Sequence, residues 1–317
     1  MRVLIDKYIP FLQGVLDGFA EACMLEPEQF TPAMVRTADA LIIRTRTRCD
    51  AALLEGSSVR FIATATIGTD HIDLAYCRSR GIHVMSCPGC NAQAVCDYVE
   101  EVLNTLAATP EKSDCTVSTK PLVSQSIGIV GVGHVGSLVA AMAERRGMHV
   151  VLSDPPLGLD GDVTTCDIIT FHTPLTRDGN CPTYHLCDAA FLARCKHDAL
   201  IVNAARGGVV DEQALLDSGR PFVIDTWENE PHISHAVLRA AQLASCHIAG
   251  YSVEGKRNAS QMCLDGITAF FSLPALRLSD EQLPQGDNAP GWLNRLSDRL
   301  KARPDDFEQI RKAYRLR

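Results

Sequence analysis

Residues 127–146 read IGIVGVGHVGSLVAAMAERR and contain the pattern G-x-G-x-x-G at Gly131, Gly133 and Gly136. An apolar run precedes the glycines and an amphipathic segment follows them, as in a strand that turns directly into a helix. In such a turn the first glycine permits the tight bend, the second leaves room for a pyrophosphate, and the third lets helix and strand pack closely. Free N–H groups at the helix start can bind the phosphates. The stretch therefore predicts a strand–turn–helix unit that binds a dinucleotide.

An acidic side chain ends the next apolar run. Asp154 follows residues 150–152 and lies 18 residues beyond Gly136. A carboxylate at this place accepts hydrogen bonds from both ribose hydroxyls and repels a 2′-phosphate. The expected cofactor is therefore NAD rather than NADP. The cofactor-binding residues expected in this part of the chain are Gly131, Gly133, His134, Val135, Gly136 and Asp154.

Short apolar runs alternate with amphipathic segments along most of the chain. This alternation indicates an α/β protein with mostly parallel sheets that are covered on both faces. Strands are predicted at residues 3–5, 40–43, 61–64, 83–85, 127–130, 150–152, 168–171, 200–202, 222–224 and 246–248. Helices are predicted at residues 11–19, 74–79, 92–108, 135–146, 253–271, 292–301 and 305–314, with a polar connection at 111–123.

Composition excludes several classes of protein. With 317 residues, 46% apolar and 21% charged, the chain is neither disordered nor collagen-like, and it is long enough for two domains. A formal charge of −8 provides no overall field for nucleic acid or an anionic membrane. No apolar run reaches the ~18 residues of a membrane span, and charges follow the first residue too soon for a signal peptide. A cytoplasmic protein that binds neither nucleic acid nor membrane is expected.

Thirteen cysteines are present, an odd number that cannot pair completely within one chain. Without a secretory signal they are expected to be reduced thiols, many of them in the core. Cys87 and Cys90 form a C-x-x-C, which is compatible with a redox pair, half of a zinc site, or a plain turn into a helix. No second C-x-x-C or C-x-x-H completes a tetrahedral site, so we favour the turn and expect no bound metal.

Three kinds of chemically useful residue follow predicted strands. Arg206 comes after the strand at 200–202, Glu228 and Glu230 follow the strand that ends near Asp225, and His247 lies at the last predicted strand. The carboxyl ends of parallel strands line one crevice. There an arginine can bind a carboxylate, a histidine can exchange a proton in an alcohol–carbonyl interconversion, and a carboxylate can orient that histidine. Taken singly, each residue has an ordinary structural or surface explanation.

The order of these motifs resembles that of D-isomer-specific 2-hydroxyacid dehydrogenases from residue 1 to about 270, and weakly through residues 306–314 (DFEQIRKAY). The resemblance implies a flavodoxin-like substrate domain at residues 1–92 and 253–271, with a Rossmann-type NAD domain inserted at 93–252. Residues 272–317 would form a short C-terminal segment, a reduced counterpart of a dimerisation domain, in a homodimer. The stretches that carry the resemblance are 64–71 (TATIGTDH), 88–92 (PGCNA), 131–136, 154–156 (DPP), 171–175 (FHTPL), 203–207 (NAARG), 225–231 (DTWENEP) and 247–256 (HIAGYSVEGK).

The resemblance also implies roles for individual residues. Arg206 corresponds to the family's carboxylate-binding arginine and His247 to its proton donor and acceptor. Glu230 corresponds to the catalytic glutamate, because it immediately precedes Pro231. Further cofactor contacts are implied at Thr173, Ala204, Ala205, Arg206, Asp225 and Gly250, and substrate contacts at Thr45, Thr66 and Tyr251.

The implied reaction is the NAD-dependent oxidation of a small phosphorylated 2-hydroxyacid, 4-phospho-D-erythronate, to 2-oxo-3-hydroxy-4-phosphobutanoate during pyridoxal 5′-phosphate biosynthesis. Two alternatives stay open: another D-2-hydroxyacid such as 3-phosphoglycerate, and an NAD-sensing binding protein without turnover. A phosphorylated substrate requires cations that this acidic chain must supply locally. The candidates near motif ends are Arg44, Arg46, Arg48, His71 and Lys256.

The chain departs from the family's pattern in three places. Cys246 stands where a proline commonly precedes the histidine. Only 12 residues separate Asp154 from Asp167, so the helix usual between these strands is expected to be missing. The C-terminal segment is also shorter than the usual dimerisation domain.

Overall fold

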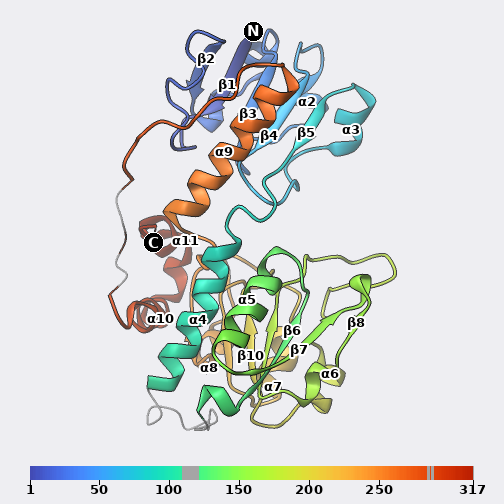
Figure 1. Ribbon diagram of the computed structural model, residues 1–317, viewed down its shortest axis with the longest axis vertical. Helices are drawn as coiled ribbons and strands as arrows, with labels where there is room; N and C mark the ends of the chain where they lie inside the picture. The colour runs from blue at the N-terminus through green and yellow to red at the C-terminus, as the bar shows by residue number, and fades with distance from the viewer. Residues whose placement is uncertain (109–120, 284–285, 287–288, 317) are drawn as a thin grey trace. The chain divides into compact units, whose positions relative to one another are not determined.

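The computed structural model describes residues 1–108, 121–283, 286 and 289–316. The chain forms two compact units, which we call unit 1 (Met1–Asn91 and Ser252–Pro284) and unit 2 (Ala92–Tyr251 and Gln285–Arg317) (Figure 1). The segment from residue 272 onward is too short for a core of its own and is expected to pack on the body or on another subunit; it is divided between the two units. Most of the expected connection at 111–123 lies outside the described residues. No helix in the described part of the chain is long and apolar enough to cross a membrane.

Unit 1 contains a five-stranded parallel sheet in the order β2-β1-β3-β4-β5. This is the flavodoxin-like strand order, which confirms the α/β prediction for this part of the chain. The strands are β1 (Arg2–Asp6), β2 (Glu21–Leu25), β3 (Ala40–Ile43), β4 (Phe61–Thr64) and β5 (His83–Met85).

Helices cover both faces of this sheet because side chains along each strand alternate between two apolar clusters. Ile42 faces the long helix α9 (Val253–Phe270), whereas Leu41 faces a cluster that includes side chains of the short helices. The remaining helical elements of unit 1 are η1 (Pro27–Gln29), α1 (Pro32–Val35), α2 (Ala51–Leu54) and α3 (Leu74–Ser79).

The helix predicted at residues 11–19 is wrong: these residues form turns. Phe11, Gly14 and Gly18 have φ angles of 68°, 75° and 85°, which a right-handed helix cannot include. Phe11 and Leu16 are nevertheless buried, and this produced the misleading helical pattern.

Unit 2 contains a seven-stranded sheet in the order β12-β11-β10-β9-β6-β7-β8, parallel except between β7 and β8. Apart from β8, this is the doubly wound order of a Rossmann fold, as expected. The strands are β6 (Ser126–Val130), β7 (His149–Asp154), β8 (Leu159–Asp160), β9 (Ile168–Phe171), β10 (Leu200–Asn203), β11 (Phe222–Ile224) and β12 (Leu243–Ala244). The α-helices before the C-terminal segment are α4 (Ala92–Ala108), α5 (His134–Arg145), α6 (Ala189–Arg194), α7 (Glu212–Asp217) and α8 (His235–Ala240).

The link from β7 to β9 contains no α-helix, as its length predicts. It consists of η3 (Pro155–Leu157), the two-residue strand β8 and η4 (Val163–Thr165). This short link packs directly on the sheet. A Cβ at Gly128 would lie only 2.6 Å from Cβ of Val163. Gly128 in β6 therefore makes room for a turn where a helix would ordinarily cover the strand.

The C-terminal helices complete the core of unit 2. Leu293 and Leu300 of α10 (Trp292–Ala302) and Phe307 of α11 (Phe307–Ala313) are fully buried in the same apolar cluster as the sheet. Oγ of Ser297 accepts a hydrogen bond of 3.0 Å from the backbone N of Ala244, which attaches α10 to β12. The link between the two helices includes η5 (Pro304–Asp306).

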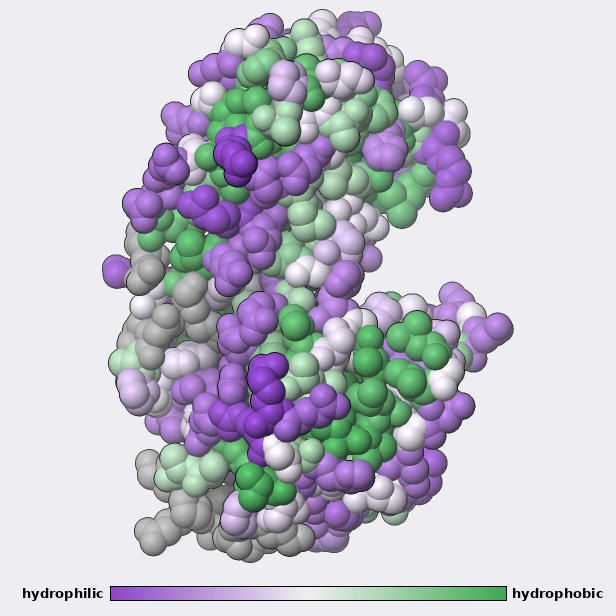
Figure 2. Space-filling view, in the orientation of Figure 1, coloured by the Kyte–Doolittle hydropathy of each residue, from purple (hydrophilic) through white to green (hydrophobic). Residues whose placement is uncertain are grey.

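The surface of each unit is mostly polar. Figure 2 shows hydrophilic residues over much of the visible surface of both units, interrupted by apolar areas. Large apolar side chains that are exposed in unit 2 include Leu157 and Leu175, whereas most of the apolar side chains lie in the core clusters beside the two sheets. Isolated apolar side chains are normal on a protein surface, so the fold buries the apolar content that the composition provides.

Candidate active site

The glycine turn between β6 and α5 has the geometry that a dinucleotide requires. Gly131 has a φ of 87°, and a Cβ there would lie 2.9 Å from N of Thr173. A Cβ at Gly136 would lie 2.0 Å from O of Gly131, so only glycine lets α5 pack against the turn. A Cβ at Gly133 would meet nothing within 4 Å. The space beside Gly133 at the start of α5 is therefore open to a ligand.

Asp154 is already joined to this turn. Its Oδ2 accepts a hydrogen bond of 2.7 Å from N of Val132. Oδ1 has no hydrogen bond to any described residue and is available to a ribose hydroxyl. His134 and Val135, the other expected contacts, form the first turn of α5, where His134 is exposed.

A buried hydroxyl without a partner lies next to the turn. Oγ1 of Thr173 is buried and has no hydrogen bond within the described chain. Buried polar atoms in proteins almost always have partners, so Thr173 fits a site completed by a polar ligand. The neighbouring His172 is no candidate for proton transfer, because burial lowers its pKa to about 3. The open space at Gly133, the unshared oxygen of Asp154 and Thr173 together fit NAD.

Glu230 and His247 form the central pair of the site. Nδ1 of His247 lies 2.8 Å from Oε2 of Glu230, and Oε1 of Glu230 accepts a 2.9 Å hydrogen bond from N of Trp227. The carboxylate is therefore held from both sides. A proton on Nδ1, facing the carboxylate, leaves Nε2 of the imidazole to exchange a proton with a substrate.

The strand predicted at residues 246–248 is wrong, because β12 ends at Ala244 and a turn follows. The buried carboxylate of Asp225 causes this turn by accepting hydrogen bonds from N of Ile248 (2.8 Å) and N of Ala249 (3.0 Å). His247 consequently has a φ of 57°, a backbone conformation that residues other than glycine rarely adopt. Asp225, expected as a cofactor contact, thus holds the loop that presents His247.

Arg206 lies on the loop after β10, beside the loop that carries Glu230. The side chain of Asn203 joins these loops, because Nδ2 donates to O of Arg206 (3.1 Å) and to O of Thr226 (3.3 Å). A Cβ at Gly207 would lie 1.8 Å from O of Trp227, so this close approach requires glycine. The expected cofactor contacts Ala204 and Ala205 are nearly buried at the start of the same loop.

The expected substrate contacts fall in both units. In unit 1, Thr45 is exposed in the turn after β3, and Thr66 follows β4 with its Oγ1 2.7 Å from Oγ1 of Thr64. In unit 2, Tyr251 ends the loop of His247 and its N donates to O of Ile248 at 2.8 Å; Gly250, an expected cofactor contact, precedes it.

Some of the expected phosphate-binding cations are already paired within unit 1. Arg44 makes two hydrogen bonds, of 2.9 and 3.1 Å, to the fully buried carboxylate of Asp6. Arg48 bonds Asp50 at 2.8 Å. Burial lowers the pKa of His71, so it is neutral near pH 7. These three residues are therefore poorly suited to bind a phosphate, whereas Arg46 is exposed and makes no ion pair with any described residue.

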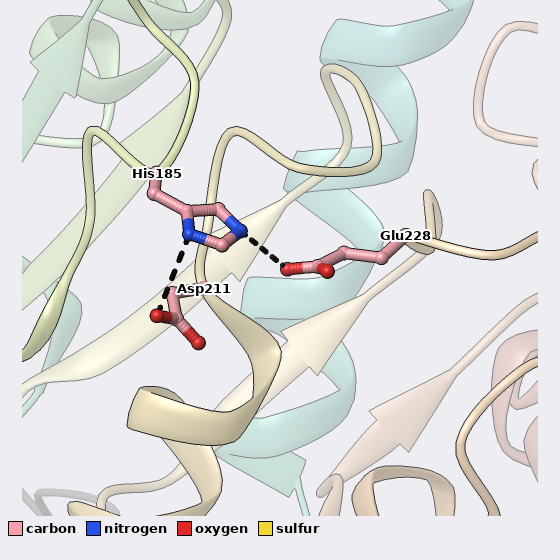
Figure 3. Close-up of side chains that lie close together, drawn as sticks. All are labelled: His185, Asp211 and Glu228. Carbon is pink, nitrogen blue, oxygen red and sulfur yellow. Dashed lines mark hydrogen bonds and ion pairs between the residues drawn. The ribbon is translucent and has the colours of Figure 1, made fainter.

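Sequence reasoning missed His185, a histidine in the loop after β9 that contacts residues following β10 and β11 (Figure 3). Nε2 of His185 lies 2.9 Å from Oε1 of Glu228, and its Nδ1 lies 3.5 Å from Oδ2 of Asp211. N of His185 also donates to O of Gly208 at 2.7 Å. No sequence motif marks His185, because its partners lie 26 and 43 positions away.

The side chains of His185, Asp211 and Glu228 lie close enough together to hold a metal ion. The same arrangement also fits hydrogen bonds between the ring and the two carboxylates. Figure 3 shows the two carboxylates against different nitrogens of the ring. A protonated imidazole donates from both nitrogens, whereas a metal ligand must leave one of them unprotonated.

The C-x-x-C forms a turn that leads into α4, with N of Cys90 donating to O of Cys87 at 3.3 Å. Sγ of Cys87 lies 3.6 Å from Sγ of Cys263. Burial raises the pKa of the Cys90 thiol to about 11, which makes it a poor nucleophile. All twelve cysteines among the described residues are free thiols.

The fold and the site define an NAD-binding dehydrogenase. Residues 92–249 match the family described as D-isomer specific 2-hydroxyacid dehydrogenase, NAD binding domain. The structure is similar to that of the TT0316 protein from Thermus thermophilus, with a TM-score of 0.70 and 25% identity over 87% of this chain and 99% of that one.

Full-length relatives narrow the class. The chain is 41% identical to erythronate-4-phosphate dehydrogenase of Bacteroides fragilis strain YCH46, over all of this chain and 97% of the relative. It is 39% identical to erythronate-4-phosphate dehydrogenase of Porphyromonas gingivalis strain W83, over 99% of this chain and 92% of the relative. The chain belongs to the D-isomer-specific 2-hydroxyacid dehydrogenases, within the group of the erythronate-4-phosphate dehydrogenases, and is an NAD-dependent oxidoreductase.

Proposed function

We propose that this enzyme oxidises 4-phospho-D-erythronate at C2 to 2-oxo-3-hydroxy-4-phosphobutanoate, a step of pyridoxal 5′-phosphate biosynthesis. The observation that carries the proposal is the 2.8 Å contact between Nδ1 of His247 and Oε2 of Glu230, on a loop next to that of Arg206. The names of the relatives support the choice of substrate.

His247 acts as the general base in this reaction. Its Nε2 accepts the proton of the C2 hydroxyl, and the negative charge of Glu230 stabilises the imidazolium that results. In the reverse direction the imidazolium returns the proton to the carbonyl oxygen. Bound NAD supplies the acceptor for the hydride that leaves C2.

Arg206 binds the carboxylate at C1 and so positions C2 and its hydroxyl for reaction at His247. Its guanidinium suits this role because it can donate two parallel hydrogen bonds to a carboxylate. The residues that would hold the cofactor are Gly131, Gly133, His134, Val135, Gly136, Asp154, Thr173, Ala204, Ala205, Asp225 and Gly250.

The proposal includes the cell compartment and the assembly state. Free thiols are typical of the reducing cytoplasm, so the twelve free cysteines among the described residues support a cytoplasmic enzyme. A homodimer is proposed by analogy with the family, and light scattering of the purified protein will test it.

The deciding experiment is absorbance-monitored NADH formation with a panel of 2-hydroxyacids. We expect kcat/KM to be highest for 4-phospho-D-erythronate, followed by 3-phosphoglycerate and the unphosphorylated acids. A higher value for another acid would reassign the substrate. NADH binding without turnover of any acid would indicate an NAD-sensing protein instead.

A further inference from the structure

The C-terminal helix α11 brings an arginine to the end of the loop that carries His247. Nε of Arg311 donates a hydrogen bond of 3.1 Å to the hydroxyl of Tyr251, four positions beyond His247. The second interaction of Arg311 is with Glu308 of the same helix, at 3.3 Å from Nη1. Its Nη2 makes no hydrogen bond within the described chain.

Arg311 is held in place by the core of unit 2. Phe307 and Ile310, on the same short helix, are 0% and 1% exposed. The ring of Tyr314 packs against the rings of Tyr251 and Trp292, with centroids 6.4 and 6.3 Å apart. These contacts attach the helix that carries Arg311 to the core of unit 2.

Arg311 also lies in the electrostatic field of the catalytic pair. Its side chain is 27% exposed. Burial lowers its pKa, but Tyr251, Glu230 and Glu308 together raise the pKa above its ordinary value.

We propose that Arg311 binds the phosphate of the substrate and makes the enzyme specific for phosphorylated D-2-hydroxyacids. The inference rests on the proposed function. With C1 bound to Arg206 and C2 at His247, the phosphate extends two carbon atoms beyond the reacting centre, and Tyr251 extends the protein surface beyond His247. A guanidinium is the side chain best suited to a phosphate, and Nη2 of Arg311 is available to it.

The test compares Arg311→Gln with Arg299→Gln, which removes an exposed arginine from the neighbouring helix α10. We expect Arg311→Gln to raise KM for 4-phospho-D-erythronate at least tenfold and to change KM for D-erythronate less than threefold. Arg311→Lys should restore part of the preference, because an ammonium keeps the charge but not the paired donors. Arg299→Gln should change neither KM.

A readout other than turnover uses inorganic phosphate with the NADH-bound enzyme. Phosphate should compete with substrate in the wild type and compete much more weakly in Arg311→Gln. Equal losses of kcat/KM for the phosphorylated and unphosphorylated acids, together with a lower melting temperature, would show that Arg311 only attaches α11.

The two proposals can fail separately. The preference for a phosphorylated acid, given as kcat/KM for the phosphorylated acid divided by kcat/KM for its unphosphorylated counterpart, is also measured with 3-phosphoglycerate and glycerate. If the wild type prefers that pair, the proposed substrate is wrong, but loss of the phosphate preference in Arg311→Gln still supports the inference. If the wild type prefers phosphorylated acids and Arg311→Gln prefers them equally, the inference is wrong and the proposed function stands.

Discussion

Glu212 and Glu228 each accept a hydrogen bond from the backbone of the other. N of Glu228 donates to Oε1 of Glu212 at 2.7 Å, and N of Glu212 donates to Oε1 of Glu228 at 3.2 Å. This exchange joins the start of α7 to the loop after β11, which carries Glu230. It also brings two carboxylates together in a largely buried place.

Replacing Glu212 with glutamine should stabilise the protein at alkaline pH. Burial, with Glu228, Glu230 and Asp211 nearby, raises the pKa of Glu212 from 4.5 to about 7. Between these pH values the folded state binds more protons than the unfolded state, so the free energy of unfolding falls as pH rises. Glutamine keeps the accepting oxygen without ionising. Urea unfolding should show a gain of about 3 kcal/mol at pH 8, from a shift of about 2.5 pKa units at about 1.4 kcal/mol each, and almost none at pH 4.5. An equal gain at both pH values would contradict this account.

Removing the imidazole of His185 should impair the site without removing a group that we place against the substrate. In His185→Gln two carboxylates lose their shared partner and the loops of Arg206 and Glu230 loosen. We expect kcat/KM to fall about tenfold, while NADH affinity stays within threefold. The exposed His197→Gln is the control and should behave like the wild type. Full activity of His185→Gln would show that the active-site loops do not depend on His185.

Substitutions of His247 and Glu230 should both lower kcat, but by different amounts. His247→Ala should lower kcat by about 10² to 10⁴-fold, because it removes the general base, and NADH binding measured by fluorescence should be unchanged. Glu230→Gln should lower kcat less. In the reductive direction its activity should fall at a lower pH than in the wild type, because the imidazolium has lost its counter-charge. A folded, NADH-binding His247→Ala enzyme with near-normal turnover would refute the mechanism.

Asp154 should control the choice between NAD and NADP. The wild type should prefer NAD at least tenfold, since its carboxylate repels a 2′-phosphate. Asp154→Asn keeps an oxygen for N of Val132 and removes the charge, so it should narrow the preference without disrupting the turn. The measurement is kcat/KM for each cofactor. Equal use of both cofactors by the wild type would remove Asp154 from this role.

Two alanine variants separate the roles of the glycines. At Gly136 the added Cβ would lie 2.0 Å from O of Gly131, so Gly136→Ala should lower both the melting temperature and NADH affinity. At Gly133 the Cβ meets no protein atom, so Gly133→Ala should keep the melting temperature and lose NADH affinity. Unchanged NADH affinity in Gly133→Ala would mean that the open space is not the pyrophosphate site.

The sequence alone was sufficient for the features that depend on local pattern. The strand–glycine–helix signal of residues 127–146 predicted the dinucleotide turn, and alternating apolar runs predicted the two α/β sheets. The 12 residues between Asp154 and Asp167 predicted the missing helix, because so short a link has no room for one. The apolar pattern predicted a helix at residues 11–19 and a strand at residues 246–248, but the positive φ angles of Phe11 and His247 belong to turns.

Only the tertiary structure decided how distant residues combine. Asp225 bends the chain at His247 through backbone groups more than twenty positions away. Arg311 reaches Tyr251 from a C-terminal helix 60 positions farther along the chain. His185 contacts Asp211 and Glu228 only after three strands bring their loops to one edge of the sheet. Hydrogen bonds and ion pairs of this kind depend on distances in space, and neither spacing nor periodicity along the chain encodes them.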